Sequence, residues 1–379
     1  MCRKLSRHIL DLASEWRALD PNSALFSTDF YQRQILMPAA GAFERAADEL
    51  DQVSSPNFPT GLVGLGVRST FFFRLITERL APTLAAGNTV LLRPFAGQLA
   101  VAQKLRALAF ESGFPEGSIE ILPDAIESST MIFQHPGVKA VSWVDSQLNA
   151  ELFPAGASWL EKKWQIHRGG KSTALVLADA DMNEAAVGIL RAIREGQGTA
   201  SWNISRIIVV ESIEKDFREC LLKHASQMSF SLNPEIQAAR ARWTEKLMRE
   251  QARPIQVPSE VVFMENVSNC TEAHQVELEA PVVFLMSVKF PHEMQKWVAN
   301  IGNAIGVQMW GSVDKIAKLA LRLETARVWS NGWVETDTDL NYANKSSAFG
   351  QMSPRVFGGF HTEPRNLDGD PSKNPHWTE

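Results

Sequence analysis

Short runs of apolar residues alternate with longer amphipathic stretches along most of this chain. The first apolar run covers residues 61–67, the second 89–93, and later ones lie at 119–122, 140–144 and 173–177. In the stretches between them, for example 98–112, apolar residues recur with the three- and four-residue spacing of a helix. Because strands that alternate with helices form parallel sheets, this order predicts a doubly wound α/β lobe.

A second series of the same kind follows. It begins with a predicted helix at 183–194 and a strand at 206–210, and it continues with strands at 282–285, 305–309 and 326–329. The pattern therefore predicts a second Rossmann-type lobe with its own parallel sheet.

These patterns divide the chain into three parts. We predict a dinucleotide-binding-type lobe with N-terminal helices at residues 1–178 and a catalytic-type lobe at 179–345. Residues 346–379 form a polar tail, and beyond Gly358 we expect it to be extended or poorly ordered.

Composition and charge narrow the range of functions. The chain has 379 residues, of which 45 % are hydrophobic, so it can bury a large core. Its net charge is −5 and its basic residues are dispersed, which argues against a nucleic-acid partner. No apolar run is long enough for a signal peptide or a membrane span. The three widely spaced cysteines favour the reducing cytoplasm, and neither they nor the histidines have the spacing of a metal site.

Four stretches together resemble one family. They are residues 81–94 (APTLAAGNTVLLRP), residues 111–117 (ESGFPEG), the GGKS at 169–172 with DADMNEA at 179–185, and residues 305–331 with the element VWSN. In this order they are similar to the aldehyde dehydrogenase superfamily over roughly residues 40 to 350. The resemblance implies an aldehyde-dehydrogenase-like α/β fold of two doubly wound lobes. The shortened N-terminal region and the tail imply that the oligomerisation arm is reduced or absent.

The positions that carry chemistry in that family differ here. Ser201 stands where the family has its nucleophilic cysteine, and His167 replaces the glutamate that activates water. Thr70 falls on the asparagine whose amide helps to bind the oxyanion. An alcohol is a far weaker nucleophile than a thiol unless a neighbouring base activates it.

The cofactor positions differ as well. The family's lysine and ribose-binding glutamate correspond to Arg93 and Ala96. The glycine-rich turn that approaches the pyrophosphate reads Asp145-Ser146, and an aspartate there repels a phosphate by roughly 4 kcal/mol if nothing relieves the charge. Glu277 matches the glutamate that contacts the nicotinamide ribose. We therefore expect no cofactor, with NAD(P) binding disfavoured.

These losses predict a pseudoenzyme with a binding or scaffolding role, whose partner is a protein such as an active paralogue. Three alternatives stay open. Ser201 and His167 can form a dyad for ester or acyl-transfer chemistry. The pocket can convert a small carbonyl or imine by acid–base chemistry through His167, Arg168 or Asp145. Finally, a residual aldehyde oxidoreductase, with another nucleophile or by direct hydride transfer, can use the same scaffold.

Overall fold

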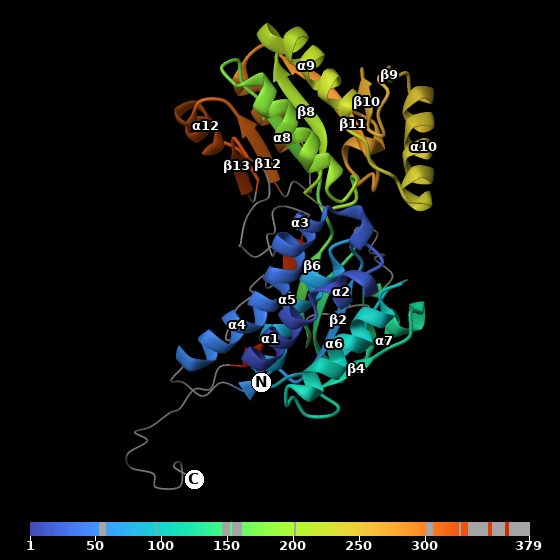
Figure 1. Cartoon of the computed structure of the whole chain (residues 1–379), viewed down its shortest axis with the longest axis vertical. Helices are drawn as coiled ribbons and strands as arrows, with labels where there is room; N and C mark the ends of the chain where they lie inside the picture. Colours follow the sequence, from blue (N-terminus) through green and yellow to red (C-terminus); the bar gives the residue numbers. More distant parts are fainter. Residues whose placement is uncertain are drawn as a thin grey trace.

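The molecule consists of two lobes stacked along its long axis, each built around one sheet (Figure 1). This computed structural model describes residues 1–52, 58–95, 97–145, 152–153, 161–200, 202–300, 306–325, 327–332, 348–350 and 361–363.

The first lobe begins with a group of helices and continues as alternating strands and helices. Its helical elements are α1 (Cys2–Asp11), α2 (Ala13–Leu19), η1 (Ser23–Leu25), α3 (Thr28–Tyr31), the π-helix η2 (Gln32–Leu36), α4 (Met37–Gln52), α5 (Phe72–Ala85), α6 (Leu99–Glu111) and α7 (Ile126–Gln134). Its strands are β1 (Phe58–Pro59), β2 (Leu62–Val67), β3 (Thr89–Arg93), β4 (Ile119–Ile121), β5 (Val138–Val144), β6 (Lys163–His167), β14 (Ala348–Gly350) and β15 (Thr362–Glu363).

The main sheet of this lobe has the order β14-β6-β5-β2-β3-β4, and all its strands except the edge strand β14 are parallel. Residues of α1, α4, α5 and α6 pack in one apolar cluster, and α7 belongs to a different cluster on β5 and β6. The chain order reverses between β2 and β5. In open α/β sheets, such a switch point at the carboxyl ends of the strands is where ligands bind.

The second lobe repeats this construction with a larger sheet. Its strands are β7 (Ser172–Val176), β8 (Ile204–Val210), β9 (Arg253–Ile255), β10 (Val262–Glu265), β11 (Val282–Val288), β12 (Gly306–Trp310) and β13 (Arg327–Ser330). Its helical elements are α8 (Met182–Arg194), η5 (Glu211–Ile213), α9 (Glu214–Gln227), α10 (Pro234–Arg249), η6 (Glu272–His274), η7 (Pro291–Glu293), α11 (Met294–Ala299) and α12 (Val313–Ala320). The strand order is β13-β12-β7-β8-β11-β10-β9, with only β9 antiparallel to its neighbour.

Local sequence explains where these elements begin. Asp181 caps α8, since its side chain accepts hydrogen bonds from the amides of Asn183 and Glu184 at 2.9 Å. Asn233 caps α10 in the same way, and Pro234 occupies the first turn. In β2, Gly66 leaves room for the Trp143 ring of β5, which a Cβ atom would approach to 2.4 Å. The Trp143 ring can therefore lie over β2 only because position 66 has no side chain.

The two parallel-sheet lobes confirm the predicted fold class, but individual strands differ from expectation. β6 has no counterpart in the predicted pattern, and the helix expected before residues 173–177 falls mostly outside the described residues. β7 pairs with β8 and β12, so residues 172–176 belong to the second sheet rather than the first. The domain boundaries as such stay a prediction.

The described parts of the tail form two short strands, and only β15 lies beyond Gly358, where we expected an extended or poorly ordered segment. β14 adds to the edge of β6, and β15 pairs with β1. His361 is buried, and its carbonyl accepts a hydrogen bond from Asn88 at 2.9 Å. These short strands are held by backbone hydrogen bonds to their partner strands, so their pairing does not require an apolar pattern in their own side chains.

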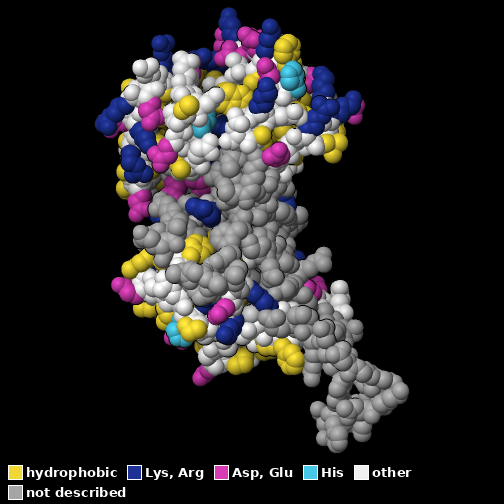
Figure 2. All heavy atoms as spheres, turned by 180° about the vertical axis from the view of Figure 1, so that it is seen from behind, with side chains coloured by type: hydrophobic (Ala, Val, Ile, Leu, Met, Phe, Trp, Pro, Cys, Tyr) yellow, Lys and Arg dark blue, Asp and Glu magenta, His cyan; other side chains and the backbone are white. Residues whose placement is uncertain are grey.

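No helix among the described residues is long and apolar enough to cross a bilayer. Figure 2 shows the molecule from behind, where Lys and Arg side chains alternate with Asp and Glu over the second lobe. The described surface in that view therefore shows no large basic patch, although the absence of a nucleic-acid partner stays a prediction.

Candidate functional site

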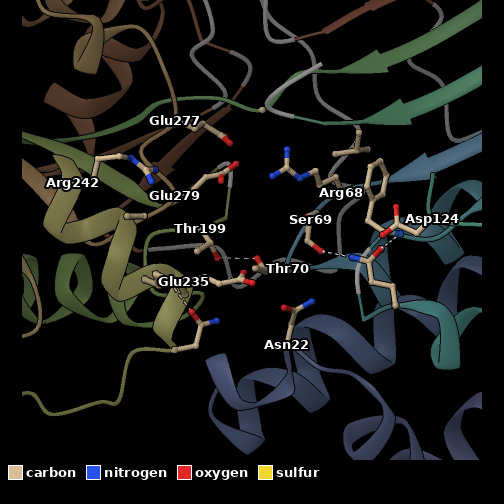
Figure 3. A pocket seen from close by; sticks show the side chains of 17 residues that line it. Asn22, Arg68, Ser69, Thr70, Asp124, Thr199, Glu235, Arg242, Glu277 and Glu279 are labelled. Carbon is tan, nitrogen blue, oxygen red and sulfur yellow. Dashed lines mark hydrogen bonds between the residues drawn. The ribbon is translucent and has the colours of Figure 1, made fainter. Parts of the chain in front are cut away.

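A cavity of about 450 Å³ lies between the lobes, at the carboxyl edge of the first sheet (Figure 3). Its walls come from the ends of β2, β3, β4 and β5, from the start of α10, and from the loop that precedes β11. This size falls within the range of small-molecule sites. The strand order places the ends of β2 and β5 at the topological switch point, so the cavity lies where this fold binds ligands.

Asp145 directly follows β5, and its negative charge is paired. The carboxylate is 11 % exposed and lies 3.5 Å from the guanidinium of Arg68, which follows β2 and lines the cavity. Asp145 also acts electrostatically on Arg93. Arg68 and Arg93 therefore offset the negative charge of Asp145. The repulsion of roughly 4 kcal/mol that we expected between Asp145 and a pyrophosphate is reduced.

Arg93 ends β3 and does not line the cavity itself. Its guanidinium contacts the Asp124 carboxylate at 2.9 Å and covers the Phe95 ring at 4.1 Å from the ring centroid. Burial lowers the pKa of Arg93, and the Asp124 carboxylate opposes that shift. Phe95 and Asp124 both line the cavity, so Arg93 holds two wall residues in place.

Thr70 faces a hydroxyl that the sequence analysis did not single out. The Oγ1 atoms of Thr70 and Thr199 lie 3.0 Å apart, and Thr199 also lies 2.5 Å from the carbonyl oxygen of Gly196. A hydroxyl donates one proton, so Thr199 donates to the carbonyl and accepts from Thr70. Both residues line the cavity. The resemblance drew attention to Ser201 alone, whereas the distance from Thr70 to Thr199 is a tertiary property.

Glu277 lies where the loop before β11 meets the connection between the two sheets. Its Oε1 accepts a hydrogen bond from the Gly170 amide at 2.5 Å. Gly169 has a φ of +81°, and a Cβ there would lie 2.5 Å from the carboxylate. Lys171 is buried and donates to the carbonyl of Val276 at 3.0 Å. Burial and Arg206 lower the pKa of Lys171 well below its ordinary value, and Glu277 opposes them.

The other predicted site residues are less informative. His167 ends β6 and is buried, and it is not among the residues that line the described cavity. Ser201 and Ser146 lie outside the described residues, so the proposed Ser201–His167 dyad stays a prediction. In the described parts of the chain, no group of His, Cys, Asp and Glu can hold a metal ion.

The chain is similar in sequence to known aldehyde dehydrogenases. The model of the aldehyde dehydrogenase family matches residues 30–253. The human 2-aminomuconic semialdehyde dehydrogenase is 25 % identical over 346 residues, which cover 82 % of this chain and 70 % of that protein. A phenylacetaldehyde dehydrogenase from Pseudomonas fluorescens is 32 % identical over 170 residues, or 45 % of this chain and 34 % of the relative.

Solved structures show the same fold. The NAD+ complex of an aldehyde dehydrogenase from Bacillus cereus superposes with a TM-score of 0.83 at 18 % identity, covering 96 % of this chain and 81 % of that one. An NAD-dependent aldehyde dehydrogenase from Sinorhizobium meliloti gives a TM-score of 0.81 at 18 % identity, covering 92 % and 77 %.

These findings contradict two predictions from the sequence. Both relatives are named dehydrogenases, and the Bacillus cereus structure is an NAD+ complex, so the main expectation of a pseudoenzyme was wrong. The expectation of no cofactor was wrong with it. The physical error was to count substituted residues one at a time, because the Asp145 charge is compensated by Arg68. Because the family model matches residues 30–253, more than half of the chain, this chain belongs to the aldehyde dehydrogenase family.

Proposed function

We propose that this protein is an NAD(P)-dependent oxidoreductase that converts an aldehyde to a carboxylic acid in the interlobe cavity. One observation carries the proposal. The cavity at the switch point brings together Arg68, whose ion pair with Asp145 balances its charge, the hydroxyl pair of Thr70 and Thr199, and carboxylates. The names of the relatives support the reaction class. The sequence left a small-molecule ligand as one possibility, and in this proposal the ligands are the aldehyde and the dinucleotide.

The residues present fit a dinucleotide. Arg68 lines the cavity with part of its side chain exposed, so its guanidinium can face a diphosphate while it holds Asp145. The Glu277 carboxylate lines the same cavity, where it can accept a hydrogen bond from a ribose hydroxyl. When bound, the nicotinamide supplies the hydride acceptor.

The oxidation must proceed without a cysteine nucleophile. Cys2 and Cys220 lie on α1 and α9, Cys270 lies in the loop before η6, and none of them lines this cavity. We therefore assign the hydrated aldehyde as the reacting species. A gem-diol that loses a hydride from carbon and a proton from one hydroxyl becomes the acid, and its second oxygen already comes from water.

The chain's own groups then bind the diol and accept its proton. The oxygens of Thr70 and Thr199 can accept hydrogen bonds from the hydroxyls of the diol, because a hydroxyl that donates its one proton still has acceptor capacity. Glu279 is half-buried, lines the cavity and has a φ of +50°, a backbone conformation that is costly for a non-glycine residue and is common at functional sites. We assign Glu279 as the proton acceptor.

The test is the appearance of reduced nicotinamide at 340 nm when the purified protein is given NAD+ or NADP+ and a panel of aldehydes. Thr199→Val should lower the rate about tenfold or more, and Glu279→Gln about a hundredfold. Thr130→Val removes a threonine hydroxyl on α7 that does not line the cavity, and should leave the rate unchanged. If no aldehyde reduces either nucleotide, the proposal is wrong. If Glu279→Gln stays fully active, the assignment of the base is wrong.

The compartment and partners are also part of the proposal. The three cysteines are free in the structure, which supports the reducing cytoplasm as the compartment. A protein partner, with an active paralogue as the candidate, stays a prediction.

A further inference from the structure

We propose that Asp124 selects the dinucleotide: its carboxylate accepts a hydrogen bond from the adenosine ribose and repels a 2′-phosphate, so that the protein prefers NAD+ to NADP+. This inference rests on the proposed function, because it requires a dinucleotide in the interlobe cavity.

The position of Asp124 matches one end of such a ligand. Asp124 follows β4 at the carboxyl edge of the first sheet. In Figure 3 it lies on one side of the cavity, Glu277 and Glu279 lie on the other, and Arg68 lies between them. β4 is three strands away from β5, and neighbouring strands are about 4.8 Å apart, so the carboxyl edge extends about 14 Å from the end of β5 to Asp124. An extended molecule with a sugar at each end and anionic groups between them suits this arrangement of charges.

The contacts of Asp124 leave it ready to accept a hydrogen bond. Arg93 donates a hydrogen bond to Oδ1 at 2.9 Å and is itself 8 % exposed. The Asp124 side chain is 42 % exposed, and the hydrogen bond to Arg93 uses only Oδ1. A carboxylate that lines a cavity and is held by an arginine is a strong acceptor for a sugar hydroxyl.

This arrangement replaces a group that the sequence lacks. The family pattern implies a ribose-binding glutamate at position 96, where this chain has alanine. Phe95 of the β3 connection and Asp124 of the β4 connection line the cavity together. A carboxylate is therefore present in the cavity after all, supplied by Asp124 at the end of β4 instead of by residue 96 after β3. A comparison of the two sequences position by position does not reveal this.

The same geometry excludes a phosphate on the ribose. A phosphate monoester carries a charge of about −1.5 to −2 at neutral pH, and its approach to a carboxylate is repulsive. Arg93, the nearby cation, is buried and already engaged by Asp124. We therefore expect the unmodified protein to bind NAD+ at least about tenfold more tightly than NADP+.

Calorimetric titration of the full chain with NAD+ and NADP+, in the absence of substrate, tests this inference through dissociation constants alone. Asp124→Asn should weaken NAD+ about tenfold and, because it frees Arg93, strengthen NADP+, so that the preference narrows or reverses. Asp124→Glu keeps the charge and should retain the preference. Glu120→Gln removes a carboxylate on the same strand that pairs with Arg106 and does not line the cavity, and both constants should stay unchanged.

The outcomes separate this inference from the proposed function. If the protein binds NAD+ but Asp124→Asn leaves the ratio of the two constants unchanged, Asp124 does not select and the oxidoreductase proposal stands. If the unmodified protein binds NADP+ more tightly than NAD+, the proposed role of Asp124 is likewise wrong, and the oxidoreductase proposal again stands. If neither nucleotide binds, both proposals fail. A melting curve of each variant without nucleotide verifies that it is folded, and a preference that Asp124→Glu retains would then confirm the role of the charge.

Discussion

The ion pair between Arg68 and Asp145 makes a quantitative prediction for cofactor binding. Replacing Arg68 with glutamine leaves the buried Asp145 carboxylate beside the expected diphosphate with one compensating cation fewer. At 3.5 Å and an effective dielectric constant near 20, the pair's attraction has an upper limit of about 5 kcal/mol. Because the Arg68 side chain is 40 % exposed, water screens it, and we reduce the expected effect to about 1–2 kcal/mol. This corresponds to a loss of NAD+ affinity of roughly 5- to 30-fold.

A double-mutant cycle measures this effect by titration of NAD+ against four proteins: the unmodified chain, Arg68→Gln, Asp145→Asn and the double variant. The double variant should recover most of the electrostatic part of the loss, because it removes the charge that Arg68 compensates. Arg106→Gln, which removes an arginine from a loose, exposed ion pair with Glu120, is the matched control and should leave the affinity unchanged. If Arg68→Gln binds NAD+ as the unmodified chain does, or if Asp145→Asn restores nothing in its background, the compensation argument is wrong.

Two further predictions concern stability. Glu78→Gln breaks the ion pair with Arg74 in α5, where both side chains are 1 % exposed, and should lower the unfolding free energy in urea by about 3–5 kcal/mol. The exposed pair Arg249–Glu245 has the same spacing, so Glu245→Gln should change it by less than about 0.5 kcal/mol, and equal losses would contradict the argument from burial. Burial lowers the pKa of His274 from 6.5 to about 4, so the unfolded chain takes up the proton first and stability is lost as the pH falls from about 6.5 toward 4. His274→Met should therefore flatten the pH dependence of the unfolding free energy over that range by up to about 1.4 kcal/mol per pH unit. An unchanged slope in His274→Met would refute this reasoning.

Periodicity allowed much of the fold to be predicted. The strand at Thr89–Arg93 was predicted to the residue, and those at 61–67 and 140–144 nearly so, because a parallel strand buried on both faces reads as a short, continuous apolar run. β6 was not predicted because its sequence, KWQIH, is not a continuous apolar run; its two apolar residues alternate with polar ones, a pattern that also indicates a strand. β14 and β15 were not predicted because they are only two or three residues long and pair with β6 and β1 through their backbones, without a hydrophobic pattern of their own.

The sequence by itself determined the family, the two-lobed architecture and the absence of a cysteine at the expected catalytic position, since each of these depends on the order of residue types along the chain. Only the tertiary structure decided how the changed positions act. It pairs Asp145 with Arg68, Thr70 with Thr199 and Arg93 with Asp124, and each pair joins segments at least 31 residues apart. A charge or a hydroxyl has a chemical effect that depends on its neighbours in space, and those neighbours come from different strand ends that meet at one edge of a sheet.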